Sequence, residues 1–152
     1  MRIYFEDLAL GQTFTTPERT ITQADVDLFA QLSGDHNPIH TDAEFCKHTP
    51  FGRPVAHGLL VVGVLSGLIE QTGLFEGTLI AMRRITELEF NRPVFPGDTI
   101  HGQIEAVGKT PQSHGGLVKF HGAVLNQRGE TVLTANYDLL LKTTSSQPLK
   151  HA

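Results

Sequence analysis

The chain has 152 residues and a mass of 16.6 kDa, which fits one globular domain. Hydrophobic residues make up 39% and there are 15 glycines, together the ordinary share of a globular protein, which excludes disorder as the main state. The formal charge of −4 lacks the basic balance of a nucleic-acid-binding protein, and the single cysteine, Cys46, excludes an internal disulfide.

Two features bear on location. The first residues mix charged and apolar side chains, unlike a secretory leader. The longest apolar run, residues 59–69, is about half the ~20 residues that a membrane-spanning helix needs. We therefore expect a soluble cytoplasmic protein with no membrane contact and no nucleic-acid partner.

The first predicted elements are a strand near residues 12–20 and a short amphipathic helix behind it. Thr22 and Asp25 have the spacing of a capping box, and Ile21 and Val26 that of a hydrophobic staple. The helix should run to about Leu32, because the next two residues are serine and glycine.

A loop is expected over residues 34–40, because the residue before a proline is disfavoured in the α conformation and Pro38 lies in this segment. Thr41 and Glu44 have the spacing to cap one more helical turn, and a second loop reaches His57. Residues 58–70 then form a helix that is apolar on every face, which predicts that protein surrounds it.

The remainder predicts β structure. Four strands are expected, followed by a loose polar tail over residues 143–152; the strands lie around residues 79–90, 99–109, 117–126 and 131–141. Successive strands favour antiparallel meander or hairpin pairing. The fold class is therefore α+β, one domain over residues 1–142 with a curved sheet around one long helix. The uncovered face and edges of such a sheet favour a homodimer or a higher homo-oligomer.

The densest polar cluster is Ser33 to Asp42, which includes Asp35 and His40. A bend at Asn37-Pro38 can direct both side chains into one cleft, where they can share a water. Histidine exchanges protons near neutral pH, and a carboxylate beside it can orient the water or act as the second acid–base group. The alternative is a solvated polar turn, and the residue chemistry leaves both interpretations open.

The sequence gives weaker evidence for other kinds of functional site. His36 and His40 have the spacing of helical metal ligands, but Pro38 disfavours the helix and no third ligand follows, so no metal site is expected. Ser66 lies inside the apolar helix, which argues against a nucleophile elbow. His57 and Gly58 begin that helix, where free N–H groups can bind an oxyanion; the alternative is a tight turn.

Three segments together resemble the family of MaoC-like dehydratases and (R)-specific enoyl-CoA hydratases. They are Phe29-x-x-Leu32-Ser33-Gly34-Asp35-x-Asn37-Pro38-Ile39-His40, Phe51-Gly52-Arg53-Pro54-Val55-Ala56-His57-Gly58 and Arg92-Pro93-Val94-Phe95-Pro96-Gly97-Asp98. One departure is Cys46, where the family usually has alanine or serine. This small-for-small change alters none of the implied site residues.

The resemblance implies a hot-dog fold, a homodimer and an acyl-CoA substrate bound near the interface. It implies that Asp35 and His40 activate water in the reversible, (R)-specific hydration of a trans-2-enoyl-CoA, with no cofactor and no metal. Asn37 would support the loop, Gly58 N–H would bind the thioester oxyanion with His57 beside it, and Ser66 would line the site. The alternatives are a hot-dog thioesterase and a non-catalytic acyl-CoA-binding subunit. Acyl length, branching and physiological direction are not determined by these residues.

Overall fold

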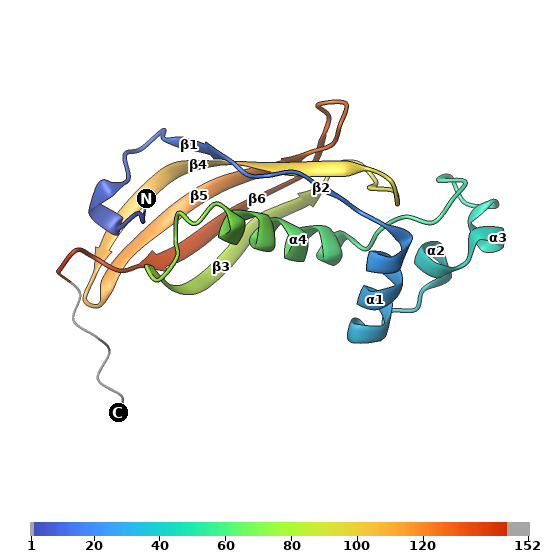
Figure 1. Ribbon diagram of the computed structural model, residues 1–152, viewed down its shortest axis with the longest axis horizontal. Coiled ribbons are helices and arrows are strands. Elements are labelled where there is room, and N and C mark those ends of the chain that lie inside the picture. The colour runs from blue at the N-terminus through green and yellow to red at the C-terminus, as the bar shows by residue number, and fades with distance from the viewer. Residues whose placement is uncertain (1, 146–152) are drawn as a thin grey trace.

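The computed structural model describes residues 2–145, which form a curved antiparallel sheet with one long helix packed beneath it (Figure 1). Five strands follow the order β1-β4-β5-β6-β3, and the short strand β2 also pairs with β4. The strands are β1 Thr13–Thr15, β2 Arg19–Thr20, β3 Leu79–Phe90, β4 Thr99–Gln112, β5 Gly115–Leu125 and β6 Thr131–Leu141. This is the predicted α+β hot-dog arrangement.

The strand order is only partly the expected one. Strands β4, β5 and β6 form the predicted meander, but β3 pairs with β6 rather than with β4. Strand β3 therefore forms one edge of the sheet among the described residues. The prediction of one continuous strand over residues 12–20 is wrong. The segment forms two short strands, β1 and β2, on either side of Pro17, which has no N–H to donate to a neighbouring strand.

Helix α1, Gln23–Ser33, begins as the sequence predicts. The Thr22 hydroxyl accepts from the Asp25 N–H at 3.1 Å, and an Asp25 carboxylate oxygen accepts from the Thr22 N–H at 2.9 Å. The staple residues Ile21 and Val26 are fully buried. Gly34 ends the helix in the left-handed region, at φ 79°, where glycine carries no steric penalty.

The segment after α1 corrects two predictions. His40 lies in a short helix, α2 Pro38–Thr41, and not in a loop. Asn37 has the non-helical conformation expected before a proline, but a proline at the first helical position has a suitable φ and loses no helical hydrogen bond. The next short helix, α3 Ala43–Cys46, is capped by Asp42, whose carboxylate accepts from the Phe45 N–H at 3.0 Å, rather than by Thr41.

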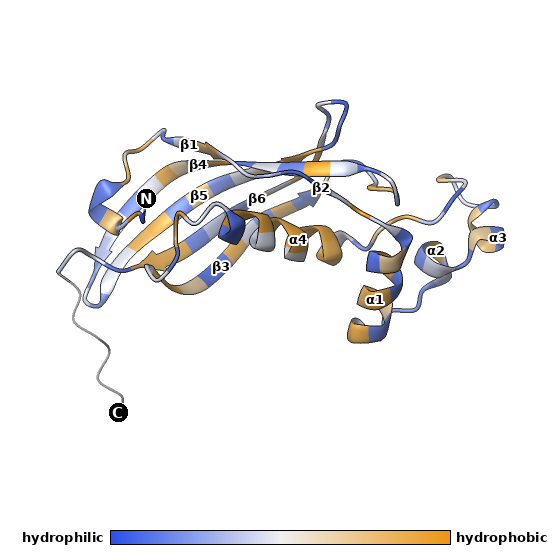
Figure 2. Cartoon of the chain, in the orientation of Figure 1, coloured by the Kyte–Doolittle hydropathy of each residue, from blue (hydrophilic) through white to orange (hydrophobic). Residues whose placement is uncertain are grey.

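Helix α4, Gly58–Gln71, packs one face against the sheet, and Figure 2 shows its apolar character. Val61, Leu65 and Leu68 are almost completely buried in the core with residues of β4, β5 and β6. Leu59, however, is 62% exposed. The prediction that protein surrounds this helix is therefore wrong for the single chain.

The first and last described segments of the chain meet at one end of the sheet. A 3-10 turn, η1 Phe5–Asp7, precedes β1, and the carboxylate of Glu6 accepts from the Thr144 N–H at 3.0 Å. The rest of the predicted tail, residues 146–152, lies outside the described residues. Across the described part of the chain, no helix is long and apolar enough to cross a membrane.

Candidate active site

The Asp35 loop is held by hydrogen bonds that begin at the last turn of α1. The Ser33 hydroxyl donates to the Phe29 carbonyl at 2.7 Å and accepts from the Asp35 N–H at 3.1 Å. Oδ1 of Asp35 accepts from the Asn37 N–H at 3.2 Å. The Asn37 side chain in turn caps α2 by accepting from the Ile39 N–H at 3.2 Å. Asp35 thus remains exposed on a locally ordered turn.

His40 is buried, with 8% of its surface exposed, and Val55 holds its ring. Nδ1 lies 2.6 Å from the Val55 carbonyl oxygen. Since a carbonyl oxygen only accepts, Nδ1 carries the proton, and Nε2 of the neutral ring keeps its lone pair. The Val55 N–H donates to the Ile39 carbonyl at 3.0 Å, so Val55 braces this short helix twice. Nε2 of His40 is therefore available as a proton acceptor.

His57, directly before α4, lies against His40. The two ring centroids are 3.7 Å apart and the ring planes differ by 25°. Nε2 of His57 lies 3.0 Å from the backbone carbonyl oxygen of Asp35, while its Nδ1 is buried and has no hydrogen-bond partner within the described residues. The Phe29 ring packs on His57 at 4.7 Å. Side chains from three segments thus form one cluster.

Asp35, His40 and His57 each bring one potential ligand atom within 4.8 Å of the others. This supplies the third group that the sequence spacing lacked. Imidazole lone pairs lie in the ring plane, so two nearly parallel rings direct them side by side rather than toward one ion at the ~2.0–2.1 Å of a Zn–N bond. One nitrogen of each ring also donates to a carbonyl. The arrangement suits proton transfer better than metal binding.

Gly58 lies where α4 begins, and Phe90 approaches it closely. A Cβ at this position would lie 2.3 Å from Cε1 of Phe90, so only glycine fits without movement. The first N–H groups of a helix have no partner inside the helix and carry the positive end of its dipole. The start of α4 can therefore stabilise a developing negative charge.

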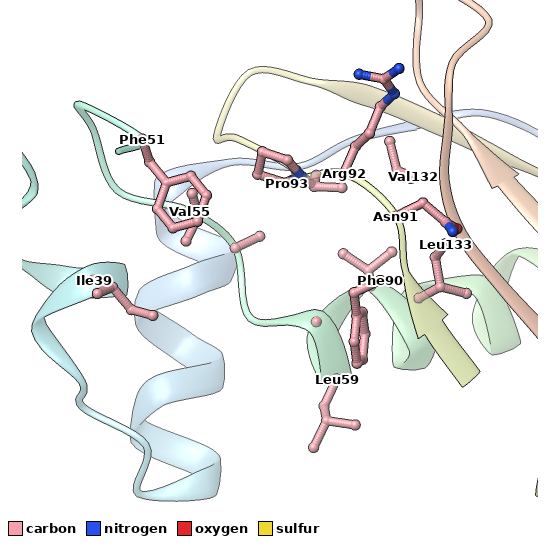
Figure 3. A pocket seen from close by; sticks show the side chains of 14 residues that line it. Ile39, Phe51, Val55, Leu59, Phe90, Asn91, Arg92, Pro93, Val132 and Leu133 are labelled. Atoms are coloured by element: carbon pink, nitrogen blue, oxygen red, sulfur yellow. The ribbon is translucent and has the colours of Figure 1, made fainter. Parts of the chain in front are cut away.

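A cavity of about 400 Å³ opens beside this helix start. Figure 3 shows Ile39, Phe51 and Val55 on one side and Phe90 and Leu133 on the other, with Arg92 extending away at the rim. Because Ile39 and Val55 are also the neighbour and the hydrogen-bond partner of His40, the cavity and the histidine pair share a wall. Its apolar lining suits a hydrophobic ligand.

The structure separates Ser66 from this cluster within the chain. Its hydroxyl donates to the Gly63 carbonyl at 2.7 Å, and it lines a different, smaller cavity of about 70 Å³ with Tyr137. The contribution of Ser66 to the site stays a prediction. Cys46, the departure from the family pattern, is buried, and its thiol donates to the Ile39 carbonyl at 3.3 Å, which braces α2.

Sequence reasoning missed two contacts of the site. Val55 acts through its backbone, and a backbone group leaves no signal in residue type. The stacking of His57 on His40 depends on tertiary structure, although the aromatic Phe29 and the histidine-glycine pair at the helix start were visible.

Comparisons with known proteins agree with this architecture. Residues 6–124 match the family model described as MaoC like domain. The protein MaoC of Klebsiella aerogenes is 38% identical over 109 residues, covering 72% of this chain, which spans only 32% of that relative. The 3-hydroxybutyryl-CoA dehydratase of Methylorubrum extorquens is 34% identical over 110 residues, covering 72% of this chain and 68% of the relative.

Two solved structures are similar over nearly the whole chain. A protein named monoamine oxidase regulatory protein, from Archaeoglobus fulgidus, superposes with a TM-score of 0.86 at 41% identity, covering 93% of this chain and 96% of its own. R-Hydratase PhaJ1 from Pseudomonas aeruginosa superposes with a TM-score of 0.80 at 31% identity, covering 99% and 94%. With the Asp35–His40 motif and the sheet wrapped over α4, these matches show that the chain belongs to the MaoC-like dehydratase family.

Proposed function

We propose that the protein catalyses the reversible hydration of a trans-2-enoyl-CoA to an (R)-3-hydroxyacyl-CoA. One observation carries the proposal: the Asp35 carboxylate and the His40 ring each bring a polar atom within 4.8 Å of the other, and the Val55 carbonyl fixes the His40 tautomer that leaves the lone pair on Nε2. The names of relatives, a 3-hydroxybutyryl-CoA dehydratase and an R-hydratase, support the same reaction class.

The reaction adds one water across the C2–C3 double bond. The Asp35–His40 pair removes a proton from water as its oxygen bonds to C3, and the pair then returns a proton to C2. In this proposal both groups act from one face of the double bond, which makes the addition syn. Elimination of water follows the same steps in reverse.

Negative charge develops on the thioester oxygen when the hydroxyl adds to C3. The N–H groups at the start of α4, Gly58 first, stabilise this charge, as fixed dipoles do in other enzymes, where removing one oxyanion donor costs about 10²–10³ in rate. The apolar cavity beside Gly58 holds the part of the substrate next to the thioester. The reaction as written needs no metal and no cofactor other than the CoA of the substrate.

We also propose that two copies of the chain form the working unit. Helix α4 exposes a stripe that includes Leu59, Gly63 and Ser66, and the edge strand β3 exposes large apolar side chains, Leu79, Met82, Ile85 and Phe90. Exposed apolar surface on one helix and the adjoining sheet edge is the surface that a second copy can cover. Such pairing would also bring Ser66 into an interface.

The test is an assay with crotonyl-CoA. We expect loss of the ultraviolet absorbance of the conjugated thioester, an (R)-3-hydroxyacyl product on chiral analysis, and no free CoA thiol. Asp35→Asn keeps the size of the side chain and an oxygen for the Asn37 N–H, and should lower kcat by about 10²–10⁴. An (S) product, thiol release, or near wild-type turnover by folded Asp35→Asn would each contradict the proposal.

A further inference from the structure

We infer that His57 is a positioning residue, whose ring fixes both members of the Asp35–His40 pair through two separate contacts. The inference rests on the proposed function for its kinetic consequence, but its structural content stands apart from it. His57 is 3% exposed and comes from the rigid start of α4. It contacts the backbone of Asp35 with one edge of its ring and the face of His40 with its own face.

The hydrogen bond to Asp35 fixes the tautomer of His57. The partner is a backbone carbonyl oxygen, which only accepts, so Nε2 of His57 carries the proton at 3.0 Å. His40 donates from Nδ1 to Val55. The two stacked rings therefore hold their protons on different nitrogens: Nε2 in His57 and Nδ1 in His40.

The segment that carries Asp35 needs a contact that fixes it to the rest of the fold. Residues 34–37 form no helix or strand, and the hydrogen bonds of Asp35 to Ser33 and Asn37 are all local. The bond from His57 reaches across 22 positions of the chain and connects this loop to α4. This hydrogen bond therefore connects the loop carrying Asp35 to the helix start that carries Gly58.

The stacking contact confines His40. The Val55 carbonyl holds Nδ1 of His40, and a rotation of the ring about that hydrogen bond would displace Nε2. The His57 ring, 3.7 Å from the His40 ring, blocks such rotation on one face, and Phe29 packs on His57 in turn at 4.7 Å. A displacement of about 1 Å can cost about 10²-fold in rate, so loss of the hydrogen bond to the Asp35 loop should lower kcat by about that factor. Loss of the stacking alone should lower kcat less, because the Val55 carbonyl still holds His40.

A direct acid–base role for His57 makes a different prediction. Its Nδ1 is buried and without a partner within the described chain. If Nδ1 took part in proton transfer, every substitution that removes it would abolish activity. If His57 only positions the pair, a side chain that keeps the donor at Nε2 restores much of the activity.

Two variants separate the contacts. His57→Gln keeps an N–H donor near the position of Nε2 and loses the ring, whereas His57→Phe keeps the ring and loses the donor. We expect His57→Phe to lower kcat about 10²-fold with KM nearly unchanged, and His57→Gln to recover at least about tenfold of that loss. His48→Phe, at an exposed histidine outside the cluster, is the matched control.

Unequal folding would not imitate this pattern, because Tm is measured for each variant beside kcat. A purely structural role predicts that kcat follows the fraction of folded protein. Folded His57→Gln that is as inactive as His57→Phe overturns the positioning role, and so does folded His57→Phe with wild-type kcat.

A second measurement uses the wild-type protein and no substrate. Nitrogen-15 NMR of labelled histidine reports which ring nitrogen carries the proton. We expect an Nε2–H signal for His57 and an Nδ1–H signal for His40; the Nδ1–H tautomer in His57 overturns the inference even if the variants do not fold. If the wild type hydrates no enoyl-CoA, the proposed function fails, while the NMR result still decides the arrangement of His57.

Discussion

His40 and His57 stack with their ring centroids 3.7 Å apart, yet each ring donates to a different backbone carbonyl, Val55 for His40 and Asp35 for His57. The pair therefore links α2, the loop after α1 and the segment before α4. Because only one nitrogen of each ring is used, the site keeps two lone pairs in a largely buried environment. The lone pair on Nε2 of His40 is the one assigned to proton transfer, whereas Nδ1 of His57 is buried without a partner within the described residues and His57 positions the pair.

His40→Asn should remove the proposed proton acceptor, Nε2 of His40, while keeping the hydrogen bond to the Val55 carbonyl. Asparagine places an amide N–H near the position of Nδ1 and can still donate to the Val55 carbonyl, but it has no counterpart of Nε2. We expect folded protein with kcat for enoyl-CoA hydration lowered by about 10²–10⁴. His36→Asn is the control, because His36 is exposed; its kcat should stay within about twofold. Equal kcat in both variants would contradict the role of His40.

Gly58→Ala should destabilise the fold through Phe90. The added Cβ would lie 2.3 Å from Cε1 of the Phe90 ring, which must swing aside; because Phe90 is 53% exposed, we expect a cost of about 1 kcal/mol, the low end for overpacking. Urea unfolding measures the loss, and Phe90→Leu in the same chain should recover part of it by making room. If Gly58→Ala and the wild type unfold at the same urea concentration, the close approach of Phe90 does not require glycine at position 58.

Local signals carried the parts of the fold that sequence could predict. The capping box of α1 was visible because Thr22 and Asp25 act within one turn, and the meander because successive strands pair through short turns. The pairing of β3 with β6 could not be predicted, since strand order depends on contacts between distant segments. The short helix that begins at Pro38 was not predicted, because a proline disfavours helix at the residue before it but suits the first position of a helix.

The site divides in the same way. Asp35 and His40 could be named from their motif, because side-chain chemistry and spacing both pointed to them. The tautomer of His40 could not, since it depends on a carbonyl oxygen of Val55, and the hydrogen bond of His57 to the Asp35 backbone is likewise invisible in residue types. For Ser66 the sequence predicted the position on helix α4 but not the direction of the side chain, which lines another cavity of the same chain.

The proposed dimer predicts that a charge on the exposed stripe of α4 disrupts assembly. Within the single chain a Cβ at Gly63 meets no atom within 4 Å, so Gly63→Glu should leave the monomer folded. Light scattering should give twice the 16.6 kDa chain mass for the wild type and the chain mass for the variant. Leu10→Glu, at a residue 63% exposed before β1, is the control and should stay dimeric. A monomeric wild type would contradict the dimer.

Tyr137 should make the stability fall at high pH. Its side chain is 4% exposed, and burial raises the pKa of its hydroxyl to about 12. The phenol of an unfolded chain has a pKa of about 10. Below pH 10 both states are protonated; between about 10 and 12 only the unfolded state releases the proton, so the free energy of unfolding falls by up to ~1.4 kcal/mol per pH unit.

Tyr137→Phe should remove this part of the pH dependence. The hydroxyl has no hydrogen-bond partner within the described residues, and a buried unpaired polar group costs about 1–3 kcal/mol, so the variant should be at least as stable as the wild type at pH 8. Urea unfolding at pH 8 to 11 gives the difference between the two proteins, which should widen above pH 10. Tyr4→Phe, at the only other tyrosine of the sequence, is the control. A constant difference across this range would mean that the Tyr137 hydroxyl ionises as readily in the folded protein as in the unfolded chain.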